Sequence, residues 1–181
     1  SLKNAWGLMQ ENNVVTLPCV TEEGLLEGVI TIGDITKSYM NLYDSSIISK
    51  ACTKYANILD TLEGSMVVGD SEAYFDRGKV LIAAANPDLM ENYIEKHDLV
   101  ILGNRYESQL CAIEMEAGCI IVCEGAGVSL TIRKLAQERG CAVITTPYDT
   151  YTTARLINQS MPISYFMTKE NICLLYTSPS P

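Results

Sequence analysis

The feature that most constrains this fold is a series of four short apolar segments, each followed by residues with helical spacing. The segments occupy 79–85, 98–102, 119–123 and 141–145. Continuous apolar runs of this length are typical of strands that are buried on both faces. Because these strands alternate with helices, we expect right-handed βαβ crossovers and helices on both sides of the sheet. Residues 65–165 are therefore predicted to form a three-layer α/β domain with a mainly parallel sheet.

Local signals place the helices between these strands. Pro87 favours the first turn of a helix, because its missing N–H is not needed there. Gly140 is a natural C-terminal cap, because glycine tolerates the left-handed conformation. Asp149 or Thr150 can cap the last helix. The predicted helices begin at Pro87 and cover 105–117, about 125–139 and about 150–159.

The first part of the chain has a different organisation. A helix is predicted over 2–12 and is followed by β-rich segments at 14–20 and 25–31, with a turn at 21–24 between them. Pro18 lies inside the first segment and confines it to an edge strand or to a strand that ends early. The expected order of elements is therefore α-β-β-α.

Helical spacing begins near Gly33 and continues, with a break at 44–46, to about Leu62. The polar and aromatic segment 64–78 is interpreted as a connector, which places a domain boundary near residue 64. Two strands and two helices cannot cover both faces of their own sheet. We therefore expect that residues upstream, or a partner, complete the first domain.

The charge of the chain limits its partners. It carries 22 acidic and 13 basic residues, for a net charge of −9, and the basic residues are scattered singly. Such a chain repels a polyphosphate backbone, so no nucleic-acid partner is expected. A small nucleotide stays a candidate, because a few local donors can hold it. With neither a signal peptide nor a long apolar run, a cytoplasmic protein without membrane association is expected.

The cysteines and the single histidine do not indicate a metal or redox site. Seven cysteines are present without a CxxC pair, and most lie in apolar runs. They are therefore expected to act as small buried hydrophobic residues. His97 lies in a polar turn without ligand-spaced partners, which favours a surface position.

The strongest candidate for a binding site is the segment around Thr31 and Asp34. A strand ends in a hydroxyl residue, and a carboxylate follows three positions later at the start of a helix. The Thr31 hydroxyl and the helix N-terminal amides can donate to a phosphate. The Asp34 carboxylate can accept from two ribose hydroxyls. The alternative is that Asp34 only caps its helix, for which aspartate is a favoured residue.

Residues 1–62 resemble the C-terminal two thirds of a CBS module. The resemblance rests on Ala5 and Met9 in the first helix, on the run VVTLPCV at 14–20, and on GVITIGDIT at 28–36. It implies a partial CBS module. In that family the matching threonine and aspartate hold the phosphate and ribose of an adenine nucleotide.

The same resemblance assigns the candidate site. It implies that Thr31 and Asp34 bind the nucleotide, and that the backbone near Val15, Thr16 and Pro18 lies beside the base. The implied ligands are AMP, ADP, ATP or a diadenosine polyphosphate.

Residues 65–165 resemble the DRTGG family. The segments NPDLMENYIEKHDLVILGNRYESQLCAIE and CAVITTPYDTYTTARLI carry the resemblance. The Asp-Arg of the family stands here as Asn104-Arg105, and its Thr-Gly-Gly stands as Cys123-Glu124-Gly125. Both signatures are degenerate, which argues against a ligand role for these loops.

The order of the parts narrows the resemblance further. Residues 166–172 look like the start of a second CBS module. A CBS–DRTGG–CBS order is similar to the regulatory region of manganese-dependent family II inorganic pyrophosphatases. That implies a fragment without catalytic residues, a parent hydrolase with DHH-type catalytic domains downstream, and a DRTGG domain that acts as spacer and homodimerisation element. Residues 173–181 are rich in Ser and Pro and are expected to be non-native.

Two other functions stay open at this point. The chain could be an interaction module attached to another enzyme, such as a phosphate acetyltransferase, with tyrosines 106, 148 and 151 in a dimer contact. It could also be a small enzyme that acts on a phosphorylated metabolite at Gly125–Gly127 or at 147–153, where caps and tight turns are the alternative interpretation. Because the CBS pair is incomplete, weak or undetectable nucleotide affinity is expected for the isolated chain.

Overall fold

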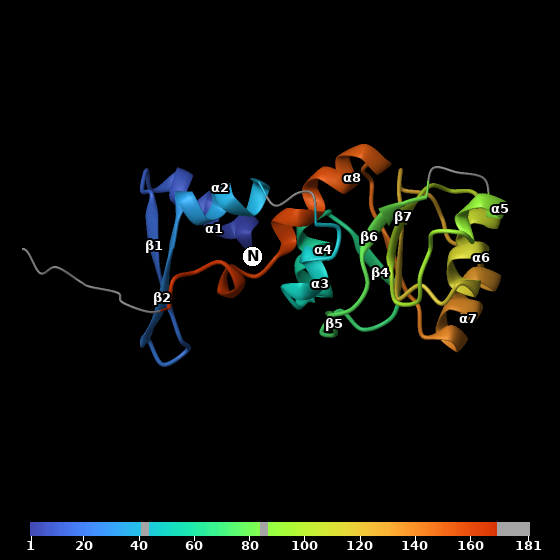
Figure 1. Ribbon diagram of the computed structural model, residues 1–181, viewed down its shortest axis with the longest axis horizontal. Coiled ribbons are helices and arrows are strands. Elements are labelled where there is room, and N and C mark those ends of the chain that lie inside the picture. The colour runs from blue at the N-terminus through green and yellow to red at the C-terminus, as the bar shows by residue number, and fades with distance from the viewer. Residues whose placement is uncertain (41–43, 84–86, 170–181) are drawn as a thin grey trace, which may run out of the picture.

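The computed structural model describes residues 1–40, 44–83 and 87–169. The molecule is elongated, with a small helix-and-hairpin unit at one end and a larger α/β unit at the other (Figure 1). The first unit consists of α1 (Leu2–Glu11), β1 (Thr16–Val20), β2 (Leu26–Thr31) and α2 (Ile32–Met40). This order confirms the predicted α-β-β-α arrangement.

The two strands of the first unit form an antiparallel pair in which Thr16 lies opposite Thr31. Their inner face carries Cys19 and Ile30, which are buried in one core with Met9 of α1. The strands thus alternate between a core face and an outer face, as expected for a sheet with one covered side.

The helix expected to run on to Leu62 is interrupted in the structure. It is replaced by α3 (Ile47–Lys50), β3 (Thr53–Lys54) and α4 (Tyr55–Thr61). Cys52 takes a left-handed φ of 52°, and the buried Thr53 hydroxyl donates to the Ile48 carbonyl at 2.8 Å. Thr53 and Lys54 then pair with β5 (Tyr74–Phe75), so a tertiary contact ends the helix where the local sequence has no breaker.

The α/β unit contains a five-stranded sheet in the order β4-β9-β8-β7-β6. Its strands are β4 (Ser65–Val68), β6 (Val80–Ile82), β7 (Leu99–Leu102), β8 (Cys119–Val122) and β9 (Ala142–Thr145). The four predicted strands are present and parallel. The interpretation of 64–78 as a connector is wrong in part, because β4 adds an antiparallel edge strand beside β9.

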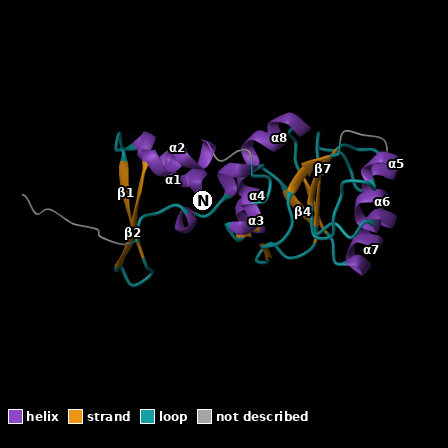
Figure 2. Cartoon of the chain, viewed as in Figure 1, coloured by secondary structure: helices purple, strands orange, loops and turns teal. Residues whose placement is uncertain are grey.

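Helices cover both faces of this sheet, which confirms the three layers (Figure 2). They are α5 (Pro87–Met90), α6 (Tyr106–Glu114), α7 (Leu130–Arg139) and α8 (Thr150–Leu156), followed by the 3₁₀ turns η1 (Ile157–Ser160) and η2 (Ile163–Tyr165). Gly140 caps α7 with a left-handed φ of 68°, as predicted. Helix α7 begins later than expected, because Ser129 caps it by accepting from the Ile132 amide.

The two faces of the sheet belong to two cores. One face, with Val100, Ile120 and Val143, packs under α5, α6 and α7. The other face, which includes Ile121 and Ile144, joins a core that continues through η1 and α4 to the hairpin. The two units are therefore not independent, because one apolar core runs through both.

The C-terminal part of the described chain bonds back to the hairpin unit at two places. The Leu2 amide donates to the Met161 carbonyl at 2.9 Å, which fixes the start of α1 on the turn after η1. Val29 and Thr168 exchange two backbone hydrogen bonds of 3.0 and 2.9 Å. The predicted start of a second module at 166–172 is described only to residue 169, and the predicted tail at 173–181 lies outside the described residues.

A buried carboxylate organises the starts of β6 and β7. The Asp98 side chain is 1% exposed and accepts the Lys79 amide through Oδ1 and the Glu95 amide through Oδ2, both at 2.9 Å. Its carbonyl accepts the Gly118 amide at 2.9 Å. Three separate segments are thus bonded to one residue.

The partly exposed His97 lies in the same turn with a φ of 73°. A Cβ on Gly118 would lie 2.8 Å from the His97 carbonyl oxygen, and one on Gly78 would lie 2.3 Å from it. Both glycines are therefore required by close backbone approach rather than by a ligand.

Replacement of Asp98 by alanine leaves the partly buried Lys79 and Glu95 amides without their acceptor. We expect Asp98→Ala to lower the free energy of unfolding by about 3 kcal/mol in urea titrations. The exposed Asp76, which forms an ion pair with its neighbour Arg77 at 3.5 Å, is the control. Asp76→Ala should change stability by about 0.5 kcal/mol or less. Equal effects of the two variants would contradict this role of Asp98.

Thr61 tests the reverse case, the removal of a buried polar group that is not hydrogen-bonded. Its buried hydroxyl has no hydrogen-bond partner among the described residues. We expect Thr61→Val, which keeps the shape, to raise the free energy of unfolding by about 1 kcal/mol. Thr53→Val is the matched control, since the buried Thr53 hydroxyl does have an acceptor. It should lower stability, and a stabilising Thr53→Val would show that the hydrogen bond contributes nothing.

Candidate functional site

The residues singled out in the first unit gather at one end of the β1–β2 pair. Thr16 lies opposite Thr31 and Pro18 lies opposite Val29 in the register of the strands. The Val15 carbonyl accepts the Ile32 amide at 2.9 Å. Residues that are far apart in the sequence thus come together where β2 passes directly into α2.

Thr31 and Asp34 form a reciprocal set of hydrogen bonds at the start of α2. The Asp34 Oδ2 atom accepts from the Thr31 amide at 2.9 Å and from the Thr31 hydroxyl at 2.7 Å. The Asp34 amide donates back to the Thr31 Oγ1 at 3.2 Å. This is the geometry of a capping box, in which two residues satisfy each other's backbone donors.

The capping interpretation of Asp34 is therefore correct for the chain by itself, and the geometry still permits a ligand. Both bonds from Thr31 end on Oδ2, and no described residue donates to Oδ1. That atom can accept from a hydroxyl group brought by a ligand. The half-buried positions of Thr31 and Asp34 leave room for such an approach.

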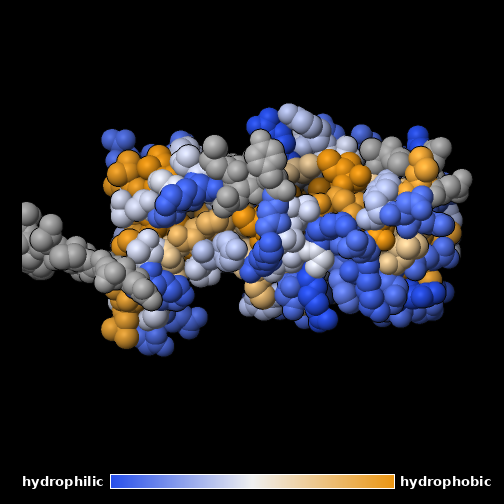
Figure 3. Space-filling model, viewed as in Figure 1, coloured by the Kyte–Doolittle hydropathy of each residue, from blue (hydrophilic) through white to orange (hydrophobic). Residues whose placement is uncertain are grey.

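Exposed apolar side chains surround the capping box. Val15 is 62% exposed, and Val14 and Ile32 are 39% and 40% exposed. Hydrophobic surface is visible over this end of the molecule in Figure 3. Such a surface can receive the flat apolar face of a base, while the polar pair Thr31–Asp34 holds a sugar or phosphate.

One contact of this region was not expected from the sequence. Thr168 pairs with Val29 on the strand that carries Thr31, and Met167 is buried in the core of the hairpin unit. A Cβ on Gly28 would come within 2.9 Å of the Thr168 carbonyl, so Gly28 makes this approach feasible. No local signal predicts this pairing, because its partners lie at opposite ends of the chain.

The other loops considered as ligand sites lie in the α/β unit and serve as turns and caps. The Glu124 amide donates to the Tyr148 carbonyl and the Gly125 amide to the Thr146 carbonyl, both at 2.8 Å. These amides are thus committed to a tight turn. Asp149 caps α8, and the hydrogen bond from the Thr152 amide lowers the pKa of its carboxyl group.

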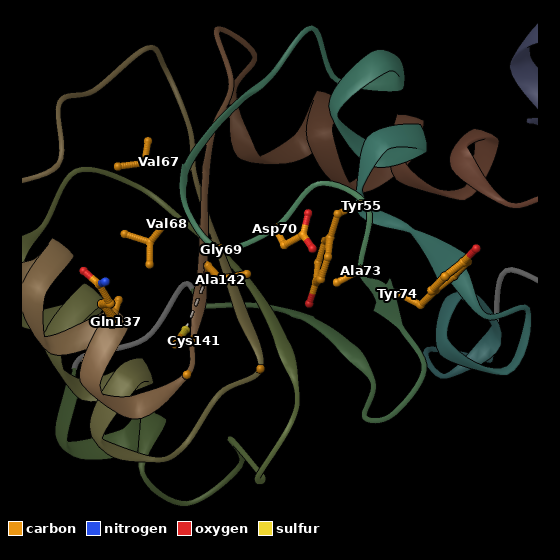
Figure 4. A pocket seen from close by; sticks show the side chains of 13 residues that line it. Tyr55, Val67, Val68, Gly69, Asp70, Ala73, Tyr74, Gln137, Cys141 and Ala142 are labelled. Atoms are coloured by element: carbon orange, nitrogen blue, oxygen red, sulfur yellow. Dashed lines mark hydrogen bonds between the residues drawn. The ribbon is translucent and has the colours of Figure 1, made fainter.

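A separate pocket of about 610 Å³ opens beside the edge strand β4 and the C-terminal end of α7. Tyr55, Asp70, Gln137 and Cys141 are among its lining residues (Figure 4). Burial raises the pKa of the Cys141 thiol to about 12, so this thiol is not a nucleophile near neutral pH. Burial also raises the pKa of the Tyr55 hydroxyl.

The cysteines behave largely as predicted. Five of the free cysteines are buried and only Cys52 is exposed among those in the described ranges. Burial raises the pKa of Cys119 and Cys123 as well. Within residues 1–40, 44–83 and 87–169, no cluster of three or more His, Cys, Asp or Glu side chains is placed to hold a metal ion. None of the helices there is long and apolar enough to cross a membrane.

Comparison with known protein families matches residues 57–160 to the DRTGG domain. The chain belongs to the DRTGG domain family. Its DRTGG domain includes the whole five-stranded sheet. The resemblance expected from the sequence is thereby confirmed.

Two curated relatives share the DRTGG domain and the residues before it. The cobalt-dependent inorganic pyrophosphatase of Clostridium perfringens is 37% identical over 177 residues, which are 98% of this chain and 32% of the relative. The probable manganese-dependent inorganic pyrophosphatase of Thermotoga maritima is 27% identical over 163 residues, which are 90% of this chain and 30% of the relative. The chain spans about a third of the length of these relatives.

A solved structure shows the same arrangement of domains. It contains the CBS and DRTGG domains of the regulatory region of the C. perfringens pyrophosphatase, in complex with the activator diadenosine tetraphosphate. The TM-score is 0.90 at 37% identity, over 96% of this chain and 75% of the other. The predicted CBS–DRTGG fold is thus confirmed.

The capping box before the DRTGG domain should contribute to stability without any ligand. We expect Asp34→Ala to lower the free energy of unfolding by about 1 kcal/mol, because the Thr31 amide loses its acceptor. Thr36→Ala in the same helix is the control, since the exposed Thr36 hydroxyl donates to the Ile32 carbonyl within the helix. It should be neutral or slightly stabilising in thermal melts. Equal stability of the Asp34→Ala and Thr36→Ala variants would show that the capping box does not stabilise the fold.

Proposed function

We propose that this chain is the adenine-nucleotide-sensing regulatory region of an inorganic pyrophosphatase. The observation that carries the proposal is the 37% identity over nearly the whole chain to the C. perfringens enzyme, whose regulatory region has the same fold. That region was solved with diadenosine tetraphosphate as activator. Hydrolysis of diphosphate would then be the task of domains outside this chain.

In this proposal the nucleotide binds at the capping box. The Thr31 hydroxyl and the amides at the start of α2 donate to a phosphate oxygen. The Asp34 Oδ1 atom accepts from a ribose hydroxyl while Oδ2 stays bonded to Thr31. The backbone near Val15, Thr16 and Pro18 lies beside the adenine. The ligands are AMP, ADP, ATP or a diadenosine polyphosphate.

The proposal includes a second CBS module that follows residue 166. Thr168 and Lys169 already lie along β2, since Lys169 contacts the Glu27 carboxylate at 3.4 Å in addition to the Thr168–Val29 pairing. A chain that continues from here leaves the strand that carries Thr31, in the direction of Glu27. The exposed apolar residues Val15 and Val20, at 62% and 57%, would be covered by this module.

The metal of the parent enzyme would be held outside this chain. Diphosphate hydrolysis by such enzymes requires clustered metal ligands, and the described residues do not supply such a cluster. No step of the hydrolysis is therefore assigned to these residues. Manganese is the expected metal, in line with the T. maritima relative, whereas the C. perfringens relative is cobalt-dependent.

Regulation in this proposal is a population shift. A ligand that binds one arrangement of the paired CBS modules more tightly shifts the equilibrium of the attached domains. The common core that joins Ile30 of the hairpin to Met161 and Ile144 would transmit the change to the DRTGG domain. The DRTGG domain would act as the spacer between the two modules and as the homodimerisation element.

Calorimetric titration of the full-length protein with diadenosine tetraphosphate and with AMP tests the proposal. Wild-type protein should bind, and Asp34→Ala should weaken binding by about tenfold or more, because a charge-assisted hydrogen bond to the ribose is lost. The control is Glu22→Ala, which removes an exposed carboxylate from the opposite end of the hairpin.

The outcomes separate the alternatives. Equal weakening by Asp34→Ala and Glu22→Ala would mean a general charge effect and would refute the assigned site. A protein that binds neither nucleotide would refute nucleotide sensing, and the chain would then be an interaction module in which Asp34 only caps α2. Diphosphate hydrolysis by the full-length protein, measured with manganese and with cobalt, tests the parent activity.

A further inference from the structure

The pocket beside β4 and the C-terminal end of α7 plays no part in the proposed nucleotide site. Its volume is about 610 Å³, and neither Thr31 nor Asp34 is among its lining residues. Pockets of roughly 300–1,000 Å³ with a few converging polar groups are typical of small-molecule sites. We call it the β4–α7 pocket and define it by Tyr55, Asp70, Tyr74, Gln137 and Cys141.

The lining of the pocket combines buried and exposed side chains. Tyr55 and Cys141 are buried, whereas Asp70, Tyr74 and Gln137 are exposed. The other lining residues are glycine, alanine and valine. A molecule with an apolar body and one polar end therefore fits this lining.

The charge of the lining favours a cation at the polar end. Asp70 is the only Asp, Glu, Lys, Arg or His among the described residues that line the pocket. Burial raises the pKa of the Tyr55 hydroxyl and of the Cys141 thiol, so both groups stay neutral near pH 7. The formal charge that a ligand meets in the lining is thus negative.

Asp70 has an oxygen atom ready to accept a hydrogen bond. Its Oδ1 atom accepts the Glu72 amide at 2.9 Å, which holds the side chain in place, and no described residue donates to Oδ2. An ammonium group at Oδ2 would form a charge-assisted hydrogen bond, which is about twice as strong as a neutral one.

The end of α7 adds a second source of negative potential. Ala136, Gln137 and the capping Gly140 line the pocket from this end of the ten-residue helix. A helix carries the equivalent of about half a negative charge at its C-terminus, which favours cations there. Arg139 is not among the lining residues and interacts electrostatically with Glu116. The helix end and Asp70 therefore favour the same sign of ligand charge.

The tyrosine rings also suit a cation, because the faces of aromatic rings attract positive charge. The Lys54 ammonium already lies 6.0 Å from the centroid of the Tyr74 ring. Lys54 has Glu72 as its hydrogen-bond partner, and Asp70 acts on it only as a nearby charge. The Asp70 carboxylate is therefore not taken up by this lysine.

We infer that the β4–α7 pocket binds a small organic cation, an amine whose ammonium group bonds to Asp70 and whose apolar part packs against Tyr55. The inference goes beyond the proposed nucleotide sensing and does not depend on it, because the pocket shares no residue with the capping box. It gives the DRTGG domain a ligand site of its own.

Saturation-transfer difference NMR of the full-length protein with benzylamine tests the inference. This probe joins one ammonium group to a flat apolar ring, and benzyl alcohol is its neutral analogue. We expect benzylamine to bind and benzyl alcohol to bind about tenfold more weakly or less, because the alcohol lacks the charge-assisted bond to Asp70.

Asp70→Asn removes the charge and keeps an acceptor for the Glu72 amide. It should raise the dissociation constant of benzylamine by about tenfold or more and leave that of benzyl alcohol unchanged. Asp76→Asn is the matched control, because it removes an exposed carboxylate that does not line the pocket. It should change the dissociation constant by about twofold or less.

Three results would each overturn the inference. They are the absence of saturation transfer to benzylamine, equal affinities for benzylamine and benzyl alcohol, and equal weakening by Asp70→Asn and Asp76→Asn. Thermal melts check that the variants are folded. If Asp70→Asn is not, Tyr74→Leu replaces it. This variant keeps apolar bulk at an exposed position and should weaken benzylamine binding by about threefold, because the ring face is lost. Unchanged binding by Tyr74→Leu would then count against the site.

Discussion

The structure depends on the apolar core that the hairpin unit shares with the DRTGG domain. A two-stranded pair with two short helices buries too little surface to be stable alone. Here Ile30 and Met9 belong to the same core as Ile58, Ile121 and Met161. Complete burial of each large side chain contributes about 1.5–3 kcal/mol. The position of the capping box therefore depends on the shared core that joins the hairpin unit to the folded DRTGG domain.

The capping interpretation and the nucleotide interpretation of Asp34 describe one arrangement. The hydrogen bonds that cap α2 also hold the carboxylate in a single orientation, with Oδ2 engaged by Thr31 and Oδ1 without a donor among the described residues. Binding to a carboxylate that is already held in place costs less side-chain conformational entropy. A local stabilising motif can thus prepare a binding site, and a test of function must separate the two contributions.

Much of the fold could be predicted because its strongest signals are local. Strands β7 and β8 are buried on both faces and appear in the sequence as unbroken apolar runs. Strand β4 was missed because it is a half-exposed edge strand in a polar segment. The end of the helix at Cys52 depends on the tertiary pairing of Thr53 and Lys54 with β5. At the candidate site, Thr31 and Asp34 could be identified from their spacing. The pairing of Thr168 with Val29 could not, since no periodicity links residues at opposite ends of a chain.

That pairing has a mechanical consequence. Thr168 is joined to β2 by two backbone hydrogen bonds, and Lys169 adds its contact to Glu27. A pull on the chain beyond residue 169 would load β2 directly, in the direction of the strand, before it reached the five-stranded sheet. The strand under load ends in Thr31. Tension on the chain beyond residue 169 would thus act first on Val29 and Glu27, in the strand whose last residue orients Asp34.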